Sequence, residues 1–147
     1  MSLKVRDVMV KKLITVGAET TVKEAAKLMN KHEIGCLVVM KRGKPVGIVT
    51  ERDMLKRVLL KSKDPKKTKV SKIMSKPLVV GEPQTDIRDA VRLMVEGEIK
   101  RLPVVEDGHV LGLVTFTDIV RSSAYFEHVI SSLCSRCPWK KSQAGSN

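Results

Sequence analysis

Hydrophobic and polar positions follow the same order twice along this chain of 147 residues. Each half has a short apolar stretch that predicts a strand, then an apolar stripe at helical spacing, then two apolar runs joined by a glycine-bearing link, which is typical of a β-hairpin. A second helix is predicted after Thr50 and after Thr115. The predicted strands are 13–16, 36–40 and 46–49 in the first half and 78–80, 102–105 and 111–114 in the second.

The two halves are copies of one unit, because residues 5–58 align with residues 70–123 without a gap, an offset of 65 (70 − 5). Met9 falls on Met74 and Gly47 on Gly112. One strand-helix-strand-strand-helix unit is too small to bury its own sheet, so we expect two β-α-β-β-α units packed as a single α+β body. The expected organisation is repeat 1 at 1–61, a charged linker at 62–69, repeat 2 at 70–123, and a C-terminal tail at 124–147, helical to about residue 133 and then disordered.

The repeated motif Thr-x-x-Asp, at Thr50–Asp53 and Thr115–Asp118, has two interpretations. Threonine followed three positions later by an acidic residue is a capping box at a helix start. Alternatively, the carboxylate accepts both hydroxyl protons of a ribose while the threonine hydroxyl and the helix N-terminus receive a phosphate. The preceding Gly47 and Gly112 would let a flat group approach the sheet.

The duplicated unit, ending in G-[IL]-V-T-x-x-D, resembles the cystathionine-β-synthase (CBS) domain family, and two units in tandem resemble a Bateman module. The resemblance covers residues 5–123 and rests on VRDVM and VSKIM at the unit starts, TVKEAAKLM, and RLPVVEDGHVLGLVTFTD. It implies a pseudo-twofold pair that binds AMP, ADP, ATP or S-adenosylmethionine, forms a homodimer and passes the ligand state to a partner protein. It also implies that the chain is not an enzyme and that the nucleotide is a regulatory ligand rather than a catalytic cofactor.

The resemblance implies two pockets built across the pair. One would place ribose on Asp118, phosphate on Thr115 and Thr117, and adenine among Met9, Ile14, Ile34, Gly35 and Cys36. The other would place ribose on Asp53, phosphate on Thr50, Arg52, Lys100 and Arg101, and adenine among Met74, Val79 and Ile99.

The two pockets differ in charge. Arg52, Lys100 and Arg101 gather in the Asp53 pocket, where the other pocket has Thr117, Gly35 and Cys36. We therefore expect the Asp53 pocket to prefer a phosphate-bearing ligand such as AMP or ATP, and the Asp118 pocket to take a less charged ligand or stay empty. The alternative is that Lys100 and Arg101 form a solvated edge.

The excess of positive charge is concentrated in the first half of the chain. The net charge of +12 divides into +8 for residues 1–61, +4 for 62–72, −2 for 73–123 and +2 for the remainder. Such a basic surface leaves a nucleic-acid-binding protein as an alternative function, although the aromatic side chains that stack bases are scarce at 3%. A ligand-independent docking subunit is the other alternative.

No membrane span or secretory leader is apparent in the sequence, so we expect a soluble cytoplasmic protein. The three histidines are scattered, and no catalytic constellation follows from their spacing. Cys134 and Cys137 form a single Cys-x-x-Cys, which is too few ligands for a zinc site, so no metal is expected and the role of these two thiols stays open.

Overall fold

The computed structural model describes residues 3–11 and 13–122. It has the predicted mixed α+β fold, while the expected helical tail beyond residue 123 lies outside the described residues. No helix of this part of the chain is long and apolar enough to cross a bilayer. The elements are α1 (Val5–Val8), β1 (Thr15–Gly17), α2 (Val22–His32), β2 (Cys36–Lys41), β3 (Lys44–Thr50), α3 (Glu51–Met54), the π-helix η1 (Leu55–Leu59), the 3₁₀ helix η2 (Val70–Lys72), α4 (Ile87–Glu96), β4 (Arg101–Glu106), β5 (His109–Thr115) and α5 (Phe116–Ser122).

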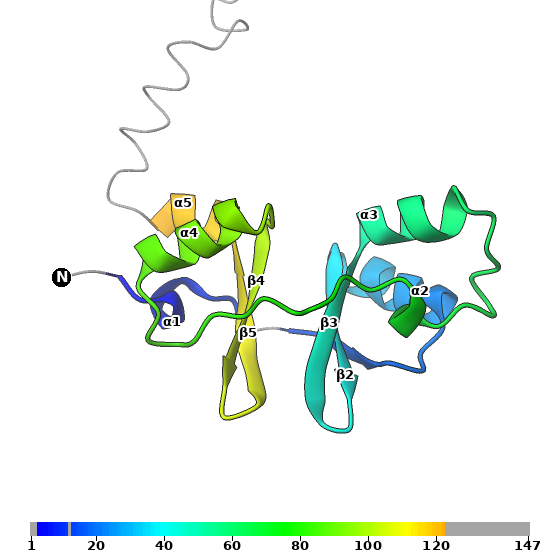
Figure 1. The fold of residues 1–147 in the computed structure, drawn as a ribbon, viewed down its shortest axis with the longest axis horizontal. Helices are drawn as coiled ribbons and strands as arrows, with labels where there is room; N and C mark the ends of the chain where they lie inside the picture. Colours follow the sequence, from blue (N-terminus) through cyan, green and yellow to red (C-terminus); the bar gives the residue numbers. More distant parts are fainter. Residues whose placement is uncertain (1–2, 12, 123–147) are drawn as a thin grey trace, which may run out of the picture.

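Two β-hairpins stand side by side in the middle of the molecule, with helices on their outer sides (Figure 1). β1 pairs in parallel with β2, which pairs antiparallel with β3, and β4 pairs antiparallel with β5. The predicted hairpins are confirmed. Their turns place Arg42 and Gly43, and likewise Asp107 and Gly108, at positive φ, the conformation that two-residue turns require.

The predicted strand at 78–80 does not form. The chain there makes a single parallel bridge, in which Gly81 N donates to Pro103 O and Val105 N donates to Gly81 O, both at 2.9 Å. This bridge is equivalent to the pairing of β1 with β2 in the first repeat. Pro77 and Pro83 flank the segment and lack the N–H groups that would extend the ladder.

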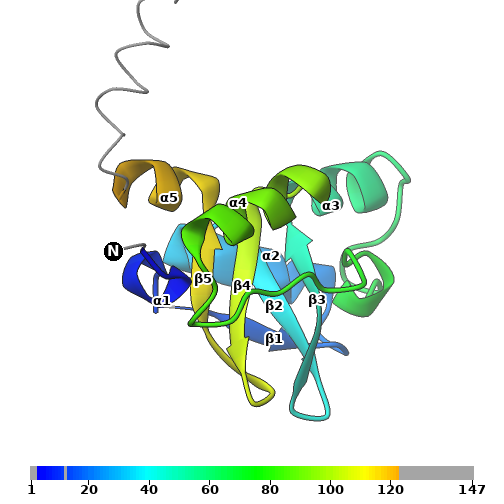
Figure 2. The same ribbon diagram turned by 60° about the vertical axis from the view of Figure 1, so that its left-hand side comes forward.

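The N-terminal segments of the two repeats are exchanged. α1 begins the first repeat but lies with α4 and α5 of the second, as Figures 1 and 2 both show. Just after α1, Val10 pairs with Leu113 of β5, and just after η2, Ser75 pairs with Ile48 of β3. Each sheet is therefore extended by a segment from the other repeat.

The hydrophobic core consists of two clusters, and because of the exchange each cluster contains residues from both repeats. Val70 and Ile73, which are fully buried, complete the core of the first repeat around Leu37 and Met29. Val5, also fully buried, belongs to the core of the second repeat. Neither cluster is complete without residues from the other repeat.

Gly47 and Gly112 provide room for the exchanged segments. A Cβ atom on Gly47 would lie 2.6 Å from Met74 Sδ, and one on Gly112 would lie 2.7 Å from Val10 O. We interpreted these glycines as sites where a flat group could approach the sheet. In the structure the group that approaches is the backbone and methionine of the other repeat.

Candidate functional site

A cavity of about 570 Å³ lies where β3 meets α3, and we call it the Asp53 cleft. Both repeats contribute to its wall, because the exchange brings Ser75 beside β3 and the hairpins bring the start of β4 opposite α3. Its lining residues are Gly35, Ile48, Thr50, Glu51, Arg52, Asp53, Lys56 and Arg57 from the first repeat and Ser75, Glu98, Ile99, Lys100 and Arg101 from the second.

Asp53 is nearly buried, at 8% exposure, and its two carboxylate oxygens differ in their partners. Oδ2 accepts from Thr50 N at 2.9 Å and from Thr50 Oγ1 at 3.1 Å, which with Asp53 N donating to Thr50 Oγ1 completes a capping box. Oδ1 accepts from Ser75 Oγ at 3.3 Å, a long hydrogen bond. The capping interpretation is thus confirmed for this motif, while Oδ1 retains capacity to accept from a further donor.

Arg57 connects Asp53 to the exchanged segment of the second repeat. Its Nη1 donates to Ile73 O at 2.7 Å and to Met74 O at 3.0 Å, and lies 3.8 Å from Asp53 Oδ1. The arginine therefore compensates a nearly buried carboxylate and satisfies two backbone carbonyls of the segment that completes the first core.

The Asp53 cleft carries a net positive charge. Five cationic side chains (Arg52, Lys56, Arg57, Lys100, Arg101) and three anionic ones (Glu51, Asp53, Glu98) line it, which gives 5 − 3 = +2. A cleft that combines a carboxylate with surplus cations can accept hydroxyl protons at one end and neutralise phosphate at the other.

Six of the eight residues that we assigned to the Asp53 pocket line this cleft. They are Thr50, Arg52, Asp53, Ile99, Lys100 and Arg101. The other two lie elsewhere: Met74 packs against the first core and Val79 against the second. The sequence assignment missed Lys56, Arg57 and Ser75. Arg57 could have been found as the basic residue four positions after Asp53 on a helix, whereas nothing in the sequence pattern places Ser75 beside β3.

The Asp118 side of the molecule has a smaller cavity of about 400 Å³, lined by Lys100, Arg101, Thr115, Phe116 and Thr117. We call it the Thr117 cavity. We assigned Lys100 and Arg101 to the Asp53 pocket alone, but their place at the start of β4 puts them on the wall of both cavities.

Asp118 forms the same capping box as Asp53, but among residues 3–11 and 13–122 its carboxylate has no further hydrogen bond or ion pair. Oδ2 accepts from Thr115 N at 3.0 Å, and Asp118 N donates to Thr115 Oγ1 at 3.1 Å. The positions equivalent to Arg57 and Ser75 hold Ser122 of the second repeat and Val10 of the first, so neither the cation nor the hydroxyl is reproduced.

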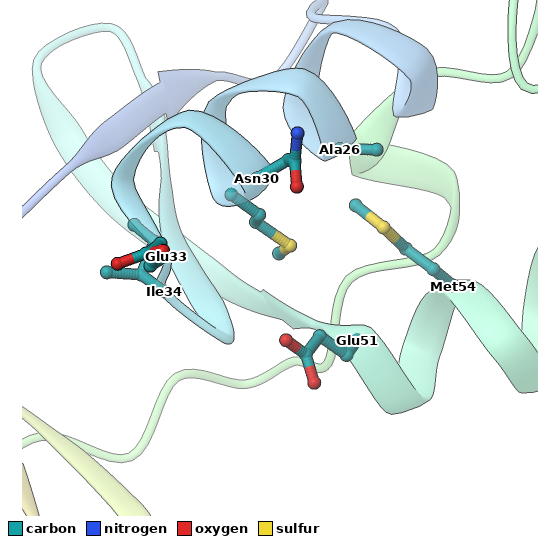
Figure 3. Close-up of a pocket in the computed structure, with 7 residues that line it drawn as sticks. Ala26, Asn30, Glu33, Ile34, Glu51 and Met54 are labelled. Carbon is teal, nitrogen blue, oxygen red and sulfur yellow. The ribbon is translucent and has the colours of Figure 1, made fainter.

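The five residues that we assigned to the adenine of the Asp118 pocket do not line the Thr117 cavity. Met9 packs against the second core and Ile14 against the first, Cys36 is buried, and Gly35 lines the Asp53 cleft. Ile34 lines a separate cavity of about 350 Å³ between α2 and α3, where Met54 and Ala26 point toward one another from facing helices (Figure 3).

Because Gly35 has no side chain, the Arg101 guanidinium of the second repeat can lie directly against its backbone. A Cβ on Gly35 would lie 2.9 Å from Arg101 Nη2 and 3.4 Å from Glu51 Oε1, so a larger side chain would displace the guanidinium. Burial raises the pKa of the neighbouring Cys36 thiol, Arg101 partly opposes that shift, and Glu51 adds to it. Cys36 is therefore a protonated core residue rather than a reactive thiolate.

No cluster of metal-ligating side chains occurs among residues 3–11 and 13–122. Cys134 and Cys137 lie outside the described residues.

Comparison with known proteins agrees with the duplicated architecture. The family model described as CBS domain matches twice, at residues 5–60 and 70–125. The CBS domain-containing protein YhcV of Bacillus subtilis is 35% identical over 129 residues, covering 88% of this chain and 91% of its own.

Solved structures give the same result. A putative signal-transduction protein with CBS domains from Burkholderia ambifaria has a TM-score of 0.76 and 32% identity, covering 82% of this chain and 93% of its own. A hexameric CBS-CP12 protein from bloom-forming cyanobacteria has a TM-score of 0.80 and 34% identity, covering 86% of this chain and 71% of its own. The protein thus belongs to the CBS domain family as a tandem pair, a class that is generally regulatory and often binds adenosyl ligands.

Proposed function

We propose that this protein is a regulatory module that binds a phosphate-bearing adenosyl ligand, AMP or ATP, in the Asp53 cleft and transmits the ligand state to a partner protein. The observation that carries the proposal is the nearly buried Asp53 carboxylate, whose Oδ1 accepts one long hydrogen bond from Ser75, in a cleft with a net charge of +2. Ribose hydroxyls would donate to Oδ1, and the phosphate would lie among Arg52, Lys100 and Arg101.

The two-repeat wall of the cleft suggests how a ligand could act. A nucleotide held by Asp53 of the first repeat and Lys100 of the second would favour the arrangement of the repeats in which both groups contact it. A ligand shifts such an equilibrium only by its difference in affinity between the two arrangements. The regulatory output therefore depends on contacts from both repeats to the same ligand.

Thermal unfolding of the full chain with AMP, ADP, ATP and S-adenosylmethionine tests this function. A ligand at about 100 times its dissociation constant adds about 2.7 kcal/mol, which for a chain of this length raises the melting temperature by roughly 5 to 10 °C. We expect this shift with AMP or ATP, little with S-adenosylmethionine, which lacks phosphate, and loss of the shift in Asp53→Ala. Asp118→Ala is the matched control, because Asp118 makes the equivalent cap.

Two outcomes would contradict the proposal. A shift that survives in Asp53→Ala and disappears in Asp118→Ala would place the ligand on the other side of the pair. The absence of a shift with all four ligands would leave a ligand-independent docking subunit as the better account.

A further inference from the structure

A further cavity, of about 630 Å³, lies outside the Asp53 cleft, and four lysines line it. We call it the lysine cavity. Lys41 comes from the end of β2, Lys69 and Lys72 from the segment around η2, and Lys76 from the extended chain that follows. Three separate parts of the fold thus direct ammonium groups to one place.

The lysine cavity and the Asp53 cleft lie on opposite sides of one extended segment. Ser75 pairs with Ile48, its N–H donating at 2.8 Å and its carbonyl accepting at 3.2 Å, and Ser75 lines the cleft. Its neighbours Met74 and Lys76 line the lysine cavity, as expected where successive side chains of an extended chain point to opposite faces. A ligand in one site would not occupy the other.

Most of the positive charge in the lysine cavity is uncompensated. Its lining includes four lysines and one carboxylate, Glu19, a net charge of 4 − 1 = +3. Glu19 pairs with Lys69, which lowers its pKa, and Lys41 and Lys72 lower it further. Among the described residues no ion pair joins Lys41, Lys72 or Lys76 to a carboxylate. Like charges held together without partners are relieved by a bound anion.

The positions related to this cavity by the 65-residue offset do not reproduce its charge. Position for position, Glu106 stands in place of Lys41 and Asp7 in place of Lys72. Of the other two equivalent positions, Lys4 stands in place of Lys69 and lies 3.8 Å from Asp86, and Lys11 stands in place of Lys76. The cluster of uncompensated lysines is therefore confined to one side of the pair and does not follow from the fold that both repeats share.

We propose that the lysine cavity is a second anion site that takes a small oligophosphate, independently of the Asp53 cleft. Ammonium groups bind phosphate as point charges from several directions, which suits a short phosphate chain. The rest of the lining in the described part of the chain is apolar (Ala18, Val46, Met74) apart from the Ser71 hydroxyl, so charge dominates recognition. Among residues 3–11 and 13–122 no aromatic side chain lines the cavity to stack a base, which disfavours single-stranded nucleic acid.

Calorimetric titration of the full chain with inorganic tripolyphosphate at about 0.15 M ionic strength tests this site, since longer-range surface attraction is largely screened there. The decisive variant is Lys41→Glu/Lys72→Asp, which installs at each position the residue that the other repeat carries there, as in Glu106 and Asp7. We expect it to weaken binding by at least about tenfold. Lys23→Glu/Lys61→Asp, an equal charge change at exposed lysines outside the cavity, and Asp53→Ala should each change affinity less than about twofold.

Three other results would each overturn the proposal. Equal weakening by the two double variants would indicate general attraction to a basic surface. Loss of binding in Asp53→Ala would place the phosphate chain in the nucleotide cleft. A single-stranded oligonucleotide that binds more tightly than tripolyphosphate, and is lost in Lys41→Glu/Lys72→Asp, would assign the cavity to nucleic acid.

Discussion

Replacing Ile73 with alanine will destabilise the first repeat, although Ile73 lies in the second repeat by sequence. Its side chain is fully buried in the first core, and an Ile→Ala change in a core costs about 2 to 5 kcal/mol through lost burial and a residual cavity. Because Ile73 and Met74, just after η2, supply the carbonyls that Arg57 contacts, the loosened segment will release η1, which continues from α3.

Native-state hydrogen exchange separates this result from general destabilisation. In Ile73→Ala we expect faster exchange in α2, β2 and β3 than in α4, β4 and β5. Val5→Ala is the matched variant, because Val5 is fully buried in the second core, and it should produce the reverse pattern at a cost of about 2 kcal/mol. Faster exchange confined to the repeat that each residue belongs to by sequence would contradict the exchanged arrangement.

Removing the two cations at the start of β4 will weaken AMP binding much more than adenosine binding. Lys100 and Arg101 line the Asp53 cleft, and a hydrogen bond to a charged group contributes about 1.5 to 3 kcal/mol. Allowing for the partial exposure of both side chains, Lys100→Gln/Arg101→Gln should lower AMP affinity roughly 10- to 100-fold. Adenosine has no phosphate, so its affinity should change little.

Calorimetric titration of both ligands measures this difference, and Lys23→Gln/Lys61→Gln is the control for a general loss of positive charge. Equal losses for AMP and adenosine would show that the two residues maintain the shape of the cleft and do not recognise phosphate. No loss for either ligand would favour the solvated-edge interpretation of Lys100 and Arg101.

The sequence pattern predicted the parts of the fold that depend on local spacing. Apolar runs with glycine-bearing links predicted both hairpins, and the motif from Thr50 to Asp53 predicted a helix start that the structure confirms as a capping box. The same pattern failed at residues 78–80, where proline on both sides limits pairing to one bridge. Local spacing therefore predicts a strand correctly only where the backbone N–H and C=O groups needed for pairing are also available.

The exchange of N-terminal segments could not be predicted from the pattern, because burial at Val5 or Val70 shows that a residue is inside but not which core it enters. That choice depends on the pairing of Val10 with Leu113 and of Ser75 with Ile48, contacts between distant parts of the chain. The consequence for the candidate site is specific: Ser75 reaches Asp53, and Met74 occupies the space beside Gly47 that we assigned to an approaching group.

The most direct test of the central claim is an NMR titration of the ¹⁵N-labelled full chain with AMP. We expect the backbone amides of Thr50, Asp53, Ser75 and Lys100 to shift most and to saturate together, since these residues from both repeats line one cleft. In Asp53→Ala the same additions should leave these signals nearly unchanged. Saturating shifts centred instead on the Thr117 cavity or on the cavity between α2 and α3, or no shifts at all, would contradict it.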